Sequence, residues 1–232
     1  MELSGVARDG FPIDEAERWD GLYGPGSGTG RRFGLLQAGV RRRVLERRDL
    51  ALSMLGSGGG ARLLDLACGA GRFAAGARSQ GWVWYGLDRS APMLRRARDG
   101  KRALTQGEVS RLPWCSESAG GVLCVGILSY FRDPRVLEIL AEIRRVLGPG
   151  GVAVVQAVRF DPLAYLRSRL PASVPRPLRI PGPLFPRSAG RLEALVRRAG
   201  LVPERKLDLT KFGGLPAATM LRASKPVEPG AP

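Results

Sequence analysis

The residues best suited to chemistry gather first between positions 63 and 73, where an apolar run passes an acidic residue and enters a glycine-rich turn. The carboxylate is Asp65, and the turn carries Gly69 and Gly71. A glycine turn between a strand and a helix lets bare backbone approach a small ligand at the carboxyl edge of a parallel sheet. The pattern therefore predicts a cofactor-binding loop.

The acidic residue in this loop decides between two classes of cofactor. Ala74 replaces the third glycine of the dinucleotide fingerprint, which that fingerprint tolerates, so the glycines alone do not separate the classes. A carboxylate at Asp65 suits a cationic amine and repels a pyrophosphate. We therefore expect S-adenosylmethionine rather than NAD.

Four motifs in chain order resemble class I S-adenosylmethionine-dependent methyltransferases of the small-molecule type, similar to methyltransferase domains 11 and 25. The first is D-x-x-C-G-x-G from Asp65, and the second is the Y-G-L-D segment that ends at Asp88. The third is a G-D-x-x-x-L-P-F segment in which Glu108 replaces the aspartate, and the fourth runs from D-P at position 133 to G-G at 151. The resemblance is strong over residues 61–156 and weaker to about residue 223.

The resemblance implies a role for each motif. The first loop would cradle the methionine moiety of the cofactor, the acidic end of the second strand would hold the ribose hydroxyls, and the third motif would flank the adenine. The implied cofactor-binding residues are Asp65, Ala67, Cys68, Gly69, Gly71, Asp88, Arg89, Met93, Glu108, Val109, Gly126 and Ile127.

The acceptor side of the site is expected after the fourth strand, where related enzymes place residues at the reacting methyl. Ser129 and Tyr130 are the catalytic candidates there. Many relatives carry histidine at these positions, and this chain has no histidine, which excludes a histidine base. Tyr130 would orient the acceptor, or act as a base if its pKa fell from about 10; packing beneath a lid is the alternative. The implied substrate-binding residues are Trp19, Tyr23, Tyr130, Phe160 and Tyr165.

Strands and helices that alternate from residue 57 onward predict an α/β fold. With the resemblance, this implies a Rossmann-like, doubly wound, mostly parallel seven-stranded sheet with an antiparallel C-terminal edge hairpin. We expect strands at 62–67, 82–87, 103–106, 121–127, 151–157, 202–209 and 217–223. We expect helices at 72–80, 91–98, 134–147 and 188–199, the third capped by Asp133 and stopped by the Gly-Pro pair at 148–149.

The expected domain organisation places an N-terminal helical cap at residues 1–56 before the binding domain at 57–224, with a disordered tail at 225–232. A proline-rich segment at 159–186, which carries several bulky apolar residues, is expected to form a lid over the acceptor. Its side chains favour an apolar or aromatic acceptor.

Composition limits the remaining possibilities. The 232 residues fit one domain, and no apolar run reaches the roughly 18 residues that a membrane span needs. The N-terminus lacks the pattern of a secretory signal. Three cysteines without paired spacing, and no histidine, predict a reducing cytoplasm and no metal site.

The net charge of +16 leaves the type of acceptor open. Only four of the 37 basic residues are lysines, and such arginine enrichment also arises from a GC-rich genome. The densest cluster, at residues 41–43, fits the solvated face of a helix. We expect a small-molecule acceptor, with RNA or another macromolecule, and cofactor binding without catalysis, as the alternatives.

Overall fold

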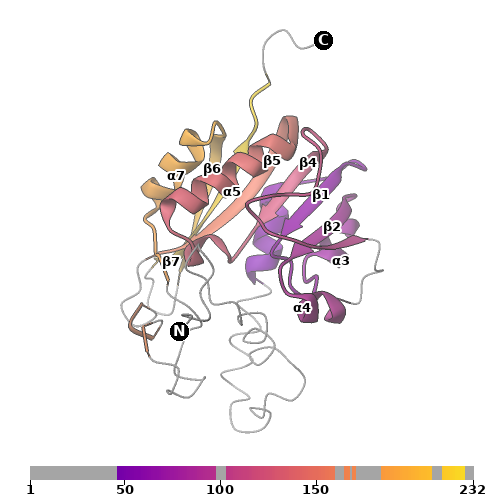
Figure 1. Cartoon of the computed structure of the whole chain (residues 1–232). Coiled ribbons are helices and arrows are strands. Elements are labelled where there is room, and N and C mark those ends of the chain that lie inside the picture. The colour runs from indigo at the N-terminus through magenta and orange to yellow at the C-terminus, as the bar shows by residue number, and fades with distance from the viewer. Residues whose placement is uncertain are drawn as a thin grey trace, which may run out of the picture.

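The computed structural model describes residues 46–97, 103–159, 165–167, 169–170, 184–210 and 216–227. Its strands form one seven-stranded sheet in the order β3-β2-β1-β4-β5-β7-β6 (Figure 1). These strands are β1 (Arg62–Leu66), β2 (Val83–Asp88), β3 (Leu104–Gln106), β4 (Ala119–Cys124), β5 (Leu147–Val158), β6 (Val202–Thr210) and β7 (Pro216–Ser224). Strands β1 to β5 pair in parallel, and β7 runs antiparallel to β5 and β6, which confirms the predicted fold class.

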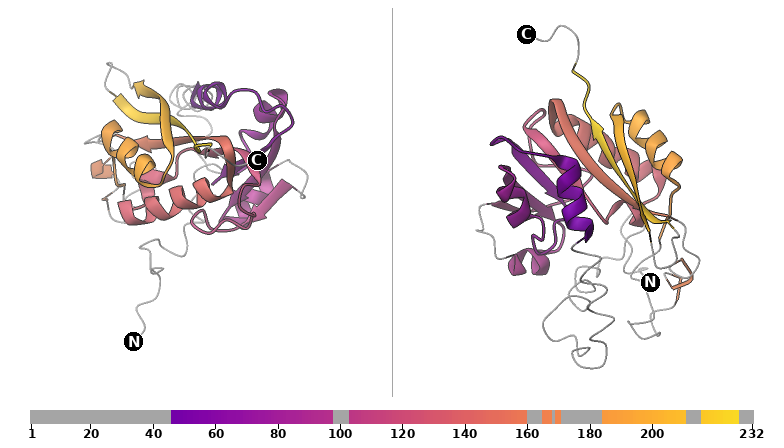
Figure 2. Two further views of the ribbon diagram at one scale, coloured as in Figure 1. Left: turned by 90° about the horizontal axis from the view of Figure 1, so that it is seen from above. Right: turned by 180° about the vertical axis from the view of Figure 1, so that it is seen from behind.

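Helices cover both faces of this sheet. One face carries α5 (Asp133–Val146) and α7 (Ala189–Arg198), and the other carries α3 (Ala74–Ser79) and the helical residues 46–55 (Figures 1 and 2). Two short elements lie at the carboxyl ends of strands: α4 (Ala91–Arg96) follows β2, and the 3-10 turn η2 (Leu128–Tyr130) follows β4. No helix within the described ranges is long and apolar enough to cross a membrane.

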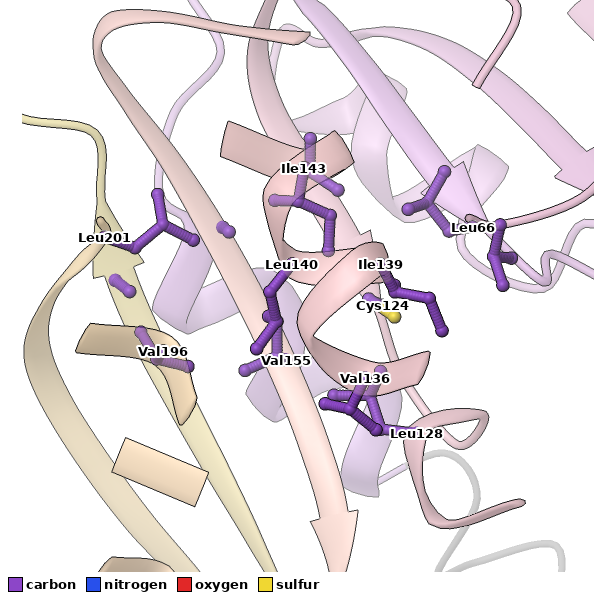
Figure 3. Packing of buried hydrophobic residues seen from close by; sticks show 14 of the residues in the cluster. Leu66, Cys124, Leu128, Val136, Ile139, Leu140, Ile143, Val155, Val196 and Leu201 are labelled. Atoms are coloured by element: carbon purple, nitrogen blue, oxygen red, sulfur yellow. The ribbon is translucent and has the colours of Figure 1, made fainter. Parts of the chain in front are cut away.

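The core under α5 follows from helical periodicity. The helix face that meets the sheet carries apolar residues at the helical spacing i, i+3, i+4 and i+7, namely Val136, Ile139, Leu140 and Ile143. All four are fully buried, and Figure 3 shows them facing the strands that carry Cys124 and Val155. Each such side chain contributes about 1.5–3 kcal/mol through burial, so this face fixes α5 on the sheet.

The ends of α5 differ from the prediction. Asp133 is the first residue of the helix rather than its cap, and the N-cap residue Arg132 makes no capping hydrogen bond through its side chain. The Asp133 carboxylate instead binds Arg187 and Arg191. The helix ends at Val146, and β5 begins at the next residue. Between the pairs Ala119–Leu147 and Gly121–Val152, the β4–β5 register shifts. The Gly-Pro pair at 148–149 lies in the resulting bulge.

Strand β4 also starts and ends earlier than predicted, at Ala119 and Cys124. Trp82 packs near its start, and the Trp82 indole N–H donates to the Gly56 carbonyl at 2.8 Å. A Cβ added at Gly121 would lie 2.9 Å from the Trp82 ring, and one at Gly120 would lie 2.8 Å from the Ala61 Cβ. Gly121 therefore makes room for the Trp82 ring, and Gly120 makes room for Ala61.

Candidate active site

The turn after β1 has a backbone that glycine favours. Ala67, Gly69 and Gly71 have positive φ angles of 57°, 56° and 73°. For a residue with a side chain, this conformation costs roughly 1–2 kcal/mol, and such strain clusters at binding sites. A Cβ added at Gly69 would meet the Met93 Cε at 3.1 Å, so Met93 packs directly over this glycine. The loop thus presents backbone rather than side chains beside α4.

Asp88, at the end of β2, joins this loop to the next turn. One carboxylate oxygen accepts a hydrogen bond from the Gly69 N–H at 2.7 Å, and the other accepts one from the Ser90 N–H at 2.8 Å. Burial raises the pKa of Asp88, and the hydrogen bonds from Ser90 and Gly69 oppose that rise. A carboxylate has about four acceptor positions, so these backbone donors still leave capacity for a ligand's hydroxyl.

Asp65, the acidic residue of the loop, lies inside the core. It is 1% exposed, and one carboxylate oxygen accepts from the Trp84 indole N–H at 3.2 Å. Burial raises its pKa to about 7, with the Trp84 hydrogen bond and the charge of Arg72 acting in the opposite direction. Its predicted pairing with the amine of a cofactor stays a prediction.

Replacing Asp65 with asparagine should remove a pH dependence of stability. An acid with a raised folded-state pKa contributes stability that is fully present below its unfolded pKa of about 3.9 and is lost as pH rises through the folded value. Because the folded pKa is about 7, the free energy of unfolding should fall from pH 5 to pH 8 relative to the variant, by on the order of 2–3 kcal/mol. Urea unfolding across this range measures it; parallel profiles for the two proteins would contradict it.

The adenine-side residues lie between the ends of β2 and β3. Arg89 and Glu108 form an ion pair at 3.3 Å with both side chains nearly half exposed, and Val109 is buried. The loop that follows is held by α5: the Leu112 N–H donates to Glu142, and the Arg145 guanidinium donates to the Leu112 and Trp114 carbonyls. Helix α5 therefore holds the loop at Leu112 and Trp114 in place through these hydrogen bonds.

Gly126, which was predicted to bind the cofactor, follows β4 just before the acceptor-side turn; its φ is 92°, and an added Cβ there would meet nothing within 4 Å. The half-buried Ile127 leads into η2. Ser129 is 2% exposed, and its hydroxyl accepts from the Val158 N–H at 2.7 Å, which ties η2 to the end of β5. Tyr130 is half-buried in the same turn.

Other predicted acceptor-side residues are placed only in part. Trp19, Tyr23 and Phe160 lie outside the described residues, as do residues 1–45 of the predicted cap. Tyr165 is 36% exposed, and the Arg169 guanidinium lies 5.0 Å from the centre of its ring. The residues predicted to bind the cofactor follow β1, β2, β3 and β4, whose carboxyl ends lie at one edge of the sheet because these strands are parallel.

Arg187 is a buried residue that sequence reasoning missed. It is 4% exposed, and its guanidinium pairs with Asp133 at 2.7 Å. It also donates to the carbonyls of Leu128, Phe131 and Phe185. Arg187 thereby holds η2, the start of α5 and the segment before α7 together. No sequence motif marks it, whereas Glu142 and Arg145 stand within the fourth motif.

Comparison with known proteins connects this geometry to a family. Residues 64–155, which contain the loop, Asp88, Gly126 and η2, match the family described as a methyltransferase domain. Residues 64–155 therefore form an S-adenosylmethionine-dependent methyltransferase domain. S-adenosylmethionine is accordingly its methyl donor. A search of curated proteins returned no match for the methyltransferase.

Solved structures share the fold of the methyltransferase. An S-adenosylmethionine-dependent methyltransferase from Mesorhizobium loti is 22% identical, with a TM-score of 0.60 over 76% of this chain and 96% of that one. One from Methanosarcina mazei is 18% identical, with a TM-score of 0.61 over 72% and 93%. The 1,6-didemethyltoxoflavin-N1-methyltransferase from Burkholderia thailandensis, solved with 1,6-didemethyltoxoflavin and S-adenosylhomocysteine, is 22% identical, with a TM-score of 0.57 over 77% and 78%.

The residues present in the methyltransferase fit its methyl donor. The bare backbone at Gly69 and the open space at Gly126 leave room beside the strand ends. Asp88 has spare acceptor capacity for hydroxyls, which suits a ribose. The thiols of Cys68 and Cys124 have pKa values raised by burial, so they stay neutral at pH 7 and do not compete as nucleophiles.

Proposed function

We propose that the enzyme transfers a methyl group to a small-molecule acceptor, apolar or aromatic in its main body, at an oxygen, nitrogen or carbon atom. The observation that supports this most is the state of three arginines near the carboxyl edge. Arg89 pairs with Glu108, Arg159 with Asp208 and Arg187 with Asp133. Nearby carboxylates already neutralise these guanidiniums, so phosphate contacts at these positions would have to compete with them.

The roles of the cofactor and of the protein's residues follow from the chemistry of methyl transfer. S-adenosylmethionine supplies an electrophilic methyl on a sulfonium, whose neutral thioether leaves with the bonding electron pair. The protein's tasks are to position the acceptor and to exclude water, with a base needed only if the acceptor must lose a proton. Gly69, Gly71 and Asp88 would hold the cofactor, and Tyr130 would orient the acceptor or accept its proton.

Acceptor choice is assigned to residues 159–186 and to the neighbourhood of Trp19 and Tyr23. The described end of the segment supports this, because it is anchored at the acceptor side. The Phe185 N–H donates to the Ser129 carbonyl at 2.7 Å, and the Arg132 guanidinium lies 5.0 Å from the centre of the Phe185 ring. The Burkholderia thailandensis enzyme of the same fold, solved with the small molecule 1,6-didemethyltoxoflavin bound, supports this type of substrate.

The alternative, RNA as the acceptor, is tested by charge removal and salt. Replacing Arg41, Arg42 and Arg43 together by glutamine removes the densest basic cluster, which lies outside the described residues. For a small-molecule enzyme, we expect methyl transfer to a metabolite panel to be nearly unchanged by the triple variant and weakly dependent on salt. Release of radiolabelled methyl product measures both.

Transfer to total RNA instead, with affinity that falls steeply with salt, would contradict the small-molecule proposal. In that case the triple variant should flatten the salt dependence, by about 0.7–0.9 in log–log slope for each lost phosphate contact.

Calorimetry with S-adenosylhomocysteine and with NAD in parallel checks the cofactor. NAD should not bind measurably.

A further inference from the structure

An ion pair in the fourth motif, between Glu142 and Arg145 of α5, holds the loop that follows β3. The Arg145 Nε donates to one carboxylate oxygen at 2.6 Å, and one terminal nitrogen donates to the other at 2.9 Å. These hydrogen bonds lower the pKa of Glu142, so its carboxylate stays charged at neutral pH. A bidentate pair of this kind has a fixed direction, which makes it suited to hold a backbone segment in one position.

The pair binds both backbone groups of Leu112. The Leu112 N–H donates to Glu142 at 2.7 Å, and the Arg145 guanidinium donates to the Leu112 carbonyl at 3.0 Å. Arg145 also donates to the Trp114 carbonyl at 2.8 Å, and its own backbone carbonyl accepts from the Glu117 N–H at 2.9 Å. Leu112 is buried in the core under α5. The loop therefore cannot shift along α5 without leaving charged groups unpaired.

The turn at residues 108–111 lies between α5 and the cofactor loop. The Arg111 N–H donates to the Glu108 carbonyl at 3.1 Å, and the two residues form an isolated bridge. On the other side, the Gly107 N–H donates to the carbonyl of Asp88 at 3.1 Å, and the Asp88 carboxylate binds the glycine loop. Glu108 is thereby fixed between the end of β2 and the last turns of α5.

Glu108 presents a carboxylate at this edge of the sheet. It forms an ion pair with Arg89 at 3.3 Å, and its side chain is 45% exposed, which leaves it accessible to a ligand. Arg89 directly follows Asp88, the proposed acceptor for the ribose hydroxyls, so a base attached to that ribose would lie near Glu108. A carboxylate only accepts hydrogen bonds, so it pairs with an amino group and not with a carbonyl oxygen. Glu108 can thus distinguish adenine from its carbonyl-bearing counterpart, hypoxanthine.

We propose that Glu142 and Arg145 are positioning residues for the adenine of the cofactor. By holding the turn at residues 108–111, they place the Glu108 carboxylate to accept a hydrogen bond from the adenine amino group. Neither side chain touches the cofactor, so their effect on the base passes through Leu112. Without them, the glycine loop and Asp88 would still bind the rest of the cofactor, and recognition of the base would be lost.

The test compares the binding of S-adenosylhomocysteine with that of S-inosylhomocysteine, in which a carbonyl replaces the amino group of the base. Calorimetry on the wild-type protein should show a preference for S-adenosylhomocysteine of at least about tenfold, because a site that pairs with an amino group rejects an analogue without it. In Arg145→Met, Glu108 is kept but its turn is released, so the preference should fall below about threefold.

Arg144→Met is the matched control. Arg144 precedes Arg145 in the same helix turn, but its Nε donates to the Gly200 carbonyl at 3.3 Å, next to the end of α7. Its removal should leave the preference at about tenfold or more. A preference retained by Arg145→Met, or lost to the same extent in Arg144→Met, overturns the assignment, as does a wild type without the preference.

Glu142→Gln keeps the assignment falsifiable if Arg145→Met does not unfold cooperatively on heating. The glutamine keeps an oxygen for the Leu112 N–H but loses the charge that orients Arg145, so the preference should fall by at least about threefold. An unchanged preference in a Glu142→Gln protein that unfolds cooperatively overturns the assignment. The methyl acceptor takes no part in these measurements, so their outcome is independent of the proposed type of substrate.

Discussion

Replacing Arg187 with methionine should lower the free energy of unfolding by at least about 3 kcal/mol. The guanidinium donates to the carbonyls of Leu128, Phe131 and Phe185, and each buried carbonyl left without a donor costs about 1–3 kcal/mol. Methionine restores packing but no hydrogen bond. Methyl transfer should also fall, because η2 with Tyr130 loses its anchor, while cofactor affinity should stay within a few-fold. Urea unfolding and calorimetry with S-adenosylhomocysteine measure the two effects.

Arg191→Met is the matched control for this prediction. Arg191 pairs with the same Asp133 at 2.7 Å, but its side chain is 57% exposed and the pair is solvated. Its loss should change the free energy of unfolding by less than about 1 kcal/mol. Burial acts to raise the pKa of Asp133, and the hydrogen bonds from Arg191 and Arg187 outweigh it, so the carboxylate stays charged in either variant. Equal effects of the two substitutions would show that Arg187 has no special role.

The positions of the cofactor loops could be predicted from sequence because they depend on local backbone rules. Gly69 and Gly71 occupy positive φ angles, and the acid at Asp88 ends a strand whose burial follows from its composition. In both cases, the residues that specify the feature lie within one strand, turn and helix, so short-range patterns were sufficient. The antiparallel C-terminal edge hairpin followed from the resemblance.

The contacts that shape the acceptor side could not be predicted, because they join residues far apart in the chain. Asp133 beside a proline is typical of a helix N-terminus, yet its carboxylate binds arginines 54 and 58 positions later.

Asp88→Ala should weaken S-adenosylmethionine binding by about tenfold or more. The carboxylate orders the glycine loop through the Gly69 N–H and the following turn through the Ser90 N–H. It is also the proposed acceptor for the ribose hydroxyls. A hydrogen bond to a charged group contributes about 1.5–3 kcal/mol, and a tenfold change in affinity corresponds to about 1.4 kcal/mol. Loss of a single ligand contact therefore accounts for the expected effect, which calorimetry measures directly.

Ser90→Ala distinguishes loss of the ligand contact from a loosened fold. The Ser90 hydroxyl caps α4 by accepting from the Met93 N–H at 3.2 Å, and removing it should cost about 1 kcal/mol of stability. The Ser90 backbone N–H still donates to Asp88, so cofactor affinity should stay within about threefold. If both variants lost affinity equally, destabilisation of the β2–α4 turn would explain the result. Undiminished affinity in Asp88→Ala would remove Asp88 from the cofactor site.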